Sequence, residues 1–224
     1  MKTDAISTVP QLAQTLPQQD RLLLGRLIEE CGELIVFGSR AAGVHSSNSD
    51  LDILCVRSKS LMGSGQLDIV SRSPGEIENP KWLGSELANH IAAYGIVLCG
   101  SADWRSAAHV SAAAVSHKQR RVISLVDGLW AYWERLHPEF RRKYLKTIRR
   151  EIQRLEYLGQ GNPVPPTPLL DRKWGQETGA LEGWVKFLQT IAAPSPLTRE
   201  RLLRTADLVA EPDAVSKRSS LPAD

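Results

Sequence analysis

Two aspartates with one residue between them, Asp50 and Asp52, are the side chains in this sequence best suited to chemistry. They open an apolar run, 51–56, that has the length and composition of a buried strand. Because side chains alternate along a strand, both carboxylates project to one face, while Leu51 and Ile53 project to the other. Two neighbouring carboxylates repel one another, and a divalent cation is the common reason to keep them together. The pair therefore predicts a metal site.

A glycine-serine pair, Gly38 and Ser39, lies ten residues before the aspartates, at the end of a short apolar strand over 34–37. If the residues after Ser39 begin a helical turn, its free N–H groups and the Ser39 hydroxyl form a cradle suited to a phosphate. Arg40 then either contacts a triphosphate or lies in solvent. A phosphate cradle facing a Mg²⁺ carboxylate pair is the apparatus of phosphoryl or nucleotidyl transfer.

A third carboxylate, Asp68, lies in the next expected strand, 66–71. Its neighbours Leu67 and Ile69 are apolar, so its side chain faces away from them. It is the only acidic residue of that strand. Asp68 is either an exposed strand residue without a role or a third member of the same site.

The order Gly38-Ser39, ten residues, Asp50-x-Asp52 resembles the signature of the DNA polymerase β-like nucleotidyltransferase superfamily. It is most similar to the minimal nucleotidyltransferases, including the antitoxin type, and more distantly to the antibiotic adenylyltransferases. The resemblance covers about residues 20–100. It implies that Asp50 and Asp52 bind two Mg²⁺ ions and that Asp68 completes the catalytic metal site.

The same resemblance assigns roles to the other site residues. Asp68 could accept the proton of the attacking hydroxyl. Gly38 and Ser39 would hold the leaving β,γ-phosphates of the NTP, with Arg40 as a further contact. Nothing in the sequence reads a nucleobase, so ATP as the NTP follows from the resemblance alone.

Apolar periodicity predicts an α+β fold in two parts. Helices over 20–31 and 81–94 accompany strands over 34–37, 51–56, 66–71 and 96–99. The resemblance implies that these form a small mixed sheet with packed helices. Beyond residue 101 the pattern is helical, including runs over 140–158 and 171–191, which predicts an all-α bundle. We expect an arm or short helix over 1–19, a nucleotidyltransferase core over 20–103, a helical bundle over 104–210 and a disordered tail over 211–224.

Composition places the chain among soluble globular proteins. The sequence has 224 residues, of which 42% are hydrophobic and 24% charged. Three cysteines without metal-like spacing predict reduced thiols. No apolar run approaches the roughly 20 residues of a membrane span, and the N-terminus lacks a signal-peptide core. These features predict a cytoplasmic protein with no membrane partner and leave its oligomeric state open.

The net charge of +3 is unevenly distributed. Residues 1–100 hold 8 Lys and Arg against 11 Asp and Glu, whereas residues 101–190 hold 15 against 9. Within the helix expected over 140–158, residues 141–154 hold seven cations against Glu151 alone. Three of them, Arg142, Lys146 and Arg149, share one face, and we call them the basic ridge. The ridge is either a solvated face or the contact for an anion, which could be RNA, an acidic protein or the NTP triphosphate.

These observations favour a Mg²⁺-dependent nucleotidyltransferase. It would move a nucleoside monophosphate, AMP from ATP, onto an acceptor hydroxyl of a protein partner or an RNA end, as in toxin–antitoxin or defence systems. One alternative is a non-catalytic antitoxin module of the same fold that neutralises its partner by contact. Another is an antibiotic adenylyltransferase, which the basic helical half disfavours because a cationic drug needs an acidic pocket.

Overall fold

The computed structural model describes residues 16–57, 65–174 and 195–210. The chain divides into two compact units. The core unit comprises residues 1–111 and 163–169, and the helical unit comprises residues 112–162 and 170–224. The division at 111 falls later than the expected boundary after 103. The predicted tail, most of the predicted arm and most of the helix expected over 171–191 lie outside the described residues.

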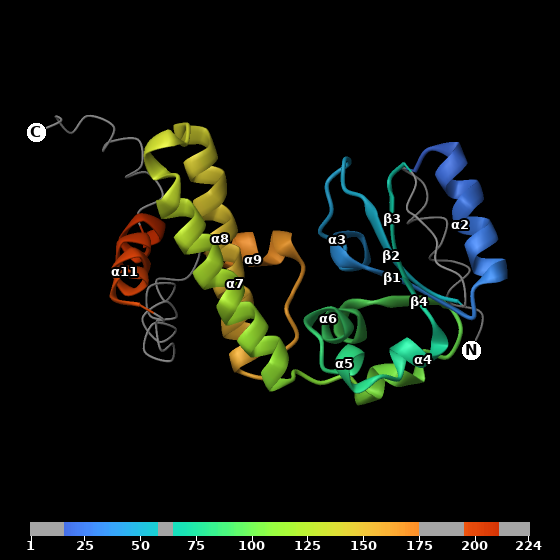
Figure 1. The fold of residues 1–224 in the computed structure, drawn as a ribbon. Coiled ribbons are helices and arrows are strands. Elements are labelled where there is room, and N and C mark those ends of the chain that lie inside the picture. The colour runs from blue at the N-terminus through green and yellow to red at the C-terminus, as the bar shows by residue number, and fades with distance from the viewer. Residues whose placement is uncertain (1–15, 58–64, 175–194, 211–224) are drawn as a thin grey trace, which may run out of the picture. The chain divides into compact units, whose positions relative to one another are not determined.

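The core unit contains a four-stranded mixed sheet (Figure 1). Its strands are β1 (Glu33–Phe37), β2 (Leu51–Val56), β3 (Leu67–Arg72) and β4 (Ile96–Cys99), in the spatial order β3-β2-β1-β4. β1 pairs antiparallel with β2 and β4, whereas β2 pairs parallel with β3. The predicted α+β fold with a mixed sheet is confirmed, and each predicted strand agrees with the structure to within one residue at either end.

Helices cover both faces of this sheet (Figure 1). On one face, α2 (Gln18–Glu30) packs its buried Leu24 and Leu27 against alternate residues of the strands. The other face is covered by α4 (Pro74–Ile77), α5 (Pro80–Leu83), α6 (Glu86–Tyr94) and the 3₁₀ turn η1 (Asp103–Ala107). Leu51 and Ile53 are fully buried on the α2 side, as their alternation predicted. Asp52 therefore points to the opposite side, which it shares with Leu54.

Two predicted helices differ from the structure. The single helix expected over 81–94 is two helices, because Ser85 begins a new one by accepting the Ala88 N–H with its Oγ atom at 3.1 Å. Asp20, at which the first helix was expected to begin, lies inside α2 and is fully buried. The Ser85 cap is a local contact, whereas the burial of Asp20 depends on packing against other elements.

A disulfide joins Cys31, which ends α2, to Cys55 of β2. The prediction of three reduced thiols is therefore wrong for this pair, while Cys99 remains a free thiol. Both bonded cysteines belong to the buried cluster on the α2 face of the sheet. Their separation of 24 residues gave no hint of pairing, because only the fold brings α2 against β2.

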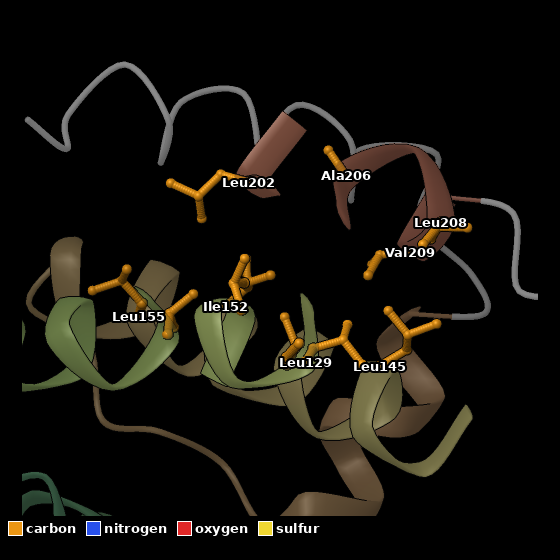
Figure 2. Packing of buried hydrophobic residues seen from close by; sticks show 11 residues of the cluster. Leu129, Leu145, Ile152, Leu155, Leu202, Ala206, Leu208 and Val209 are labelled. Carbon is orange, nitrogen blue, oxygen red and sulfur yellow. The ribbon is translucent and has the colours of Figure 1, made fainter. Parts of the chain in front are cut away.

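The helical unit is an α-hairpin with a further helix packed on it. α7 (Ala112–Ala131) and α8 (Pro138–Gly159) are joined through the 3₁₀ turn η2 (Trp133–Arg135), and α9 (Thr167–Trp174) follows. α11 (Pro196–Ala210) lays Leu202 and Ala206 over Leu129 and Ile152 of the hairpin (Figure 2). In the part of the chain that the structure describes, no helix is long and apolar enough to cross a membrane.

A buried ion pair crosses the hairpin. Glu151 of α8 accepts a hydrogen bond from Lys118 Nζ of α7 at 2.7 Å, and both side chains are almost completely buried. Arg121 and Arg154 also lie within 3.2 Å of the same carboxylate. Burial alone would raise the pKa of Glu151, but the hydrogen bond and charge of Lys118, helped by the two arginines, hold it below its usual value. Part of the positive charge of α8 is thus neutralised within the unit.

Candidate active site

The parallel pairing of β2 and β3 brings two of the predicted carboxylates side by side. Asp52 and Asp68 are register partners on the two strands, so their side chains leave the same face of the sheet. Asp50 immediately precedes β2 and is exposed, as is Asp68, whereas Asp52 is half-buried. The structure therefore gathers the three predicted acidic residues at the beginning of two adjacent strands.

The glycine-serine turn lies directly against Asp52. Phe37, the last residue of β1, is the register partner of Asp52, and the short helix α3 (Gly38–Ala41) begins at the next residue. This is the helical turn that the sequence suggested. Gly38 has a φ of +73°, and a Cβ atom there would collide with the Asp52 carboxylate. Glycine at this position is required both by its backbone conformation and by the closeness of Asp52.

The electrostatics of the site centre on Asp52. Its pKa is raised from 3.8 to about 6, first by burial and then by the charges of Asp68 and Asp50, while Arg40 acts in the opposite direction. The two neighbouring aspartates thus act on Asp52 as like charges. A carboxylate that is half-buried among like charges favours either a proton or a bound cation.

Arg40 is neither solvated nor simply available to a ligand. Its side chain is 3% exposed, and its guanidinium donates two hydrogen bonds to the Ser49 carbonyl, from Nε at 2.9 Å and from Nη2 at 2.6 Å. Ser49 directly precedes Asp50, so Arg40 anchors the loop that carries the first aspartate. Sequence reasoning missed this role because a backbone carbonyl nine residues away leaves no mark on side-chain patterns.

The donor set suits a hard divalent cation such as Mg²⁺, because all three candidate ligands are carboxylates. A cation would also relieve the repulsion that raises the pKa of Asp52. Among the described residues, however, no three His, Cys, Asp or Glu side chains form a metal site by themselves. Mg²⁺ is commonly held by one or two carboxylates together with substrate phosphates. The residues therefore fit a cation that shares its ligands with a bound triphosphate.

The basic ridge lies in the helical unit and is partly engaged by an acidic residue of α9. Lys146 Nζ is 3.4 Å and Arg149 Nη2 is 3.7 Å from the carboxylate of Asp171. Arg150 binds the same carboxylate through two hydrogen bonds, at 2.9 and 2.6 Å. Three cations thus share one carboxylate, which leaves an excess of positive charge there. Arg142, the first residue of the ridge, is exposed.

Comparison with known protein families identifies part of the core unit. Residues 24–78 match the model of the nucleotidyltransferase domain family, and the match includes the glycine-serine turn and all three aspartates. The chain therefore carries a nucleotidyltransferase domain, which confirms the resemblance seen in the sequence. The helical unit lies outside the match. No curated protein is similar enough to the chain to count as a match.

The contact between Gly38 and Asp52 can be tested with a matched pair of glycine variants. Gly38 and Gly43 both have positive φ, but a Cβ at Gly43 would meet no atom within 4 Å. Gly38→Ala should lower the free energy of unfolding by about 2 kcal/mol more than Gly43→Ala, because only the first substitution forces the Asp52 carboxylate to move. Chemical denaturation of both variants measures the difference, and equal losses would contradict the contact.

The raised pKa of Asp52 predicts a pH-dependent stability. Between pH 3.8 and about 6 the folded protein keeps a proton on Asp52 that the unfolded chain has released. Protonation of Asp52 therefore favours the folded state at low pH, and this contribution to the free energy of unfolding is lost as pH rises through about 6. In EDTA at about pH 7.5, Asp52→Asn should therefore melt about 3 °C higher than the parent. The gain is this small because Asp52 is half-buried, so solvent screens part of the charge repulsion. The gap should close near pH 4.

The control for this pH series is Asp207→Asn, which changes an exposed carboxylate on α11. Its melting temperature should follow that of the parent at every pH. A gain in Asp52→Asn that persists unchanged at about pH 4 would contradict the raised pKa.

Proposed function

We propose that this nucleotidyltransferase domain transfers a nucleoside monophosphate from an NTP, specifically AMP from ATP, to an acceptor hydroxyl in a reaction that depends on Mg²⁺. The observation that carries the proposal is the convergence at Asp52. Its carboxylate faces Asp68 across the β2–β3 pairing and lies against Gly38 of the glycine-serine turn. The two parts of the signature seen in the sequence, the glycine-serine turn and the aspartates, thus meet at one side chain, within the segment that the family model matches.

The residues take distinct roles in this reaction. Gly38 and Ser39 hold the β- and γ-phosphates, with backbone N–H groups and a hydroxyl facing the anion. Asp50, Asp52 and Asp68 would hold the metal, and Mg²⁺ bound there would neutralise phosphate charge and polarise the phosphoryl group that is transferred. Arg40 keeps Asp50 in place through the Ser49 carbonyl.

The chemical step exchanges a phosphoanhydride bond of the NTP for a phosphoester bond to the acceptor. The acceptor oxygen attacks the α-phosphorus, the bond from that phosphorus to the β-phosphate oxygen breaks, and pyrophosphate leaves. Asp68 accepts the hydroxyl proton, which is the role that the resemblance implies, and its exposed carboxylate is open to an acceptor from solvent. The product is a phosphodiester or nucleotidylated side chain, and no oxidant or reductant takes part.

The acceptor belongs to an anionic partner, either a protein or an RNA end. The support is the charge of α8, where Asp171 and Glu151 offset only some of the cations. Arg142 and Lys146 remain exposed on that helix. A cationic small molecule would be repelled by such a surface.

Transfer is tested by incubating the protein with Mg²⁺, total cell extract and each NTP in turn, labelled at the α-phosphate. Label from one NTP should enter a protein or RNA fraction, whereas the same NTP labelled at the γ-phosphate should give none. Asp50→Asn with Asp52→Asn should reduce transfer by about 1000-fold or more while the protein stays folded. Added together, Mg²⁺ and NTP should raise the melting temperature of the parent but not of this variant.

The control for that experiment is Asp103→Asn with Asp207→Asn, which removes two exposed carboxylates that are not among the proposed site residues. It should transfer at the parent rate. Equal transfer by the Asp50/Asp52 variant would exclude the mechanism. Binding of Mg²⁺ with NTP but no transfer to any fraction would favour the non-catalytic antitoxin module instead.

The basic ridge is tested with the acceptor that takes label. Changing Arg142, Lys146 and Arg149 together to Gln should raise the KM for acceptor and leave NTP affinity unchanged. If the acceptor is RNA, the slope of log affinity against log salt should become shallower by about 2. Arg26→Gln with Lys81→Gln and Arg199→Gln removes equal charge from exposed positions on other helices and serves as the control.

Identical acceptor kinetics in the two triple variants would show that the basic ridge is a solvated face that does not contact the acceptor. Loss of NTP affinity in the ridge variant alone would instead assign the ridge to the nucleotide.

A further inference from the structure

Asp20 of α2 is a fully buried carboxylate outside the predicted site. It lies on the inner face of α2, one turn before Leu24 and two before Leu27. Its Oδ2 atom accepts a hydrogen bond from the Gln66 N–H at 3.0 Å. Its Oδ1 atom is also buried and has no hydrogen-bond partner among the described residues. A leucine here would continue the apolar face of α2, so the carboxylate calls for a specific explanation.

Gln66 connects this carboxylate to the strands that carry the site. Its carbonyl accepts the Leu51 N–H at 2.8 Å, immediately before the β2–β3 pairing begins at Leu51 and Leu67. Leu51 lies between Asp50 and Asp52, and Gln66 is two residues before Asp68. The backbone of Gln66 is thus hydrogen-bonded to α2 through its N–H group and to the start of β2 through its carbonyl group.

The residue before Gln66 is fitted closely to the same carboxylate. Gly65 has a φ of +60°, and a Cβ atom there would collide with both oxygens of Asp20. The turn that leads into β3 therefore wraps against Asp20 with no room for a side chain. Backbone conformation, steric fit and a hydrogen bond all place the start of β3 relative to this one residue.

We propose that Asp20 is a positioning residue for nucleotidyl transfer, which fixes the start of β3 against β2 and so keeps Asp68 opposite Asp52. The inference rests on the proposed function for its catalytic consequence, but its structural part stands on the contacts alone. Alternation along a strand makes the placement critical, because a slip of one residue in β3 would turn Asp68 to the opposite face of the sheet.

The test compares Asp20→Ala with Asp20→Asn, which keeps an oxygen acceptor for the Gln66 N–H. In Asp20→Ala, hydrogen exchange of the Leu51 and Gln66 amides should accelerate by about tenfold or more. Its kcat should fall by about 10- to 100-fold, with the KM for NTP changed less, because misplacement of a reacting group affects the transition state most. Asp20→Asn should restore most of both the protection and kcat.

The matched control is Leu24→Ala, which opens a cavity in the same face of α2 and leaves the Asp20–Gln66 hydrogen bond in place. Measured well below its melting temperature, it should keep the parent kcat and the parent exchange at Leu51 and Gln66. If Asp20→Ala does not fold, Gly65→Ala provides a second route, because its methyl group displaces the Asp20 carboxylate. It should show the same faster exchange and the same fall in kcat.

The outcomes separate this inference from the proposed function. Parental exchange at Leu51 and Gln66 in Asp20→Ala overturns the inference, even if the parent transfers label. A fall in kcat equalled by Leu24→Ala overturns it too, because the effect would then be general destabilisation. Absence of transfer by the parent protein overturns the proposed function and the catalytic consequence of Asp20. Faster exchange in Asp20→Ala would still establish that Asp20 fixes the start of β3 against β2.

Discussion

The core unit depends on holding carboxylates that repel one another at the start of two neighbouring strands. Burial and the charges of Asp68 and Asp50 raise the pKa of Asp52 to about 6, so the folded chain bears an electrostatic penalty near neutral pH. The sheet tolerates this because helices cover both its faces. Leu51 and Ile53, which alternate with the aspartates, are fully buried, and each such side chain contributes about 1.5–3 kcal/mol. Hydrophobic burial on one side of β2 thus offsets the repulsion on the other.

The same site keeps its negative charge because its arginine is used elsewhere. Arg40 is buried and bonded to the Ser49 carbonyl, so it lowers the pKa of Asp52 only as a secondary influence. Gly38 contributes by having no side chain, which lets the Asp52 carboxylate approach the glycine-serine turn. An uncompensated acidic site beside that turn suits a metal ion that arrives with a nucleotide, and this fits the family to which residues 24–78 are matched.

The helical unit meets the opposite problem, an excess of cations, in two ways. Glu151 is buried and gathers cations from two helices, which makes those contacts part of the core packing. Asp171 is more exposed and is shared by three cations of α8. Desolvation lowers the pKa of Arg149, and this marks it as more enclosed than its exposed neighbours Arg142 and Lys146. Exposure therefore distinguishes the cations that hold the unit together from those that can meet a partner.

The sequence by itself determined the strands, the mixed α+β class and the three aspartates. Side-chain alternation is a local property, so the faces of Leu51, Asp52 and Ile53 followed from their order alone. Only the tertiary structure decided the partners of Asp20, Arg40 and Asp171 and the pairing of Cys31 with Cys55.

Asp20 shows the difference most clearly. Its spacing of four and seven residues from Leu24 and Leu27 already placed it on the buried face of α2, and that signal could have been read. Its hydrogen-bond partner could not have been predicted, because Gln66 lies 46 residues away. A hydrogen bond to a backbone amide constrains the position of that amide but not the residue type that carries it, so the sequence around Gln66 records nothing of the contact. Contacts of this kind exist only once the chain has folded.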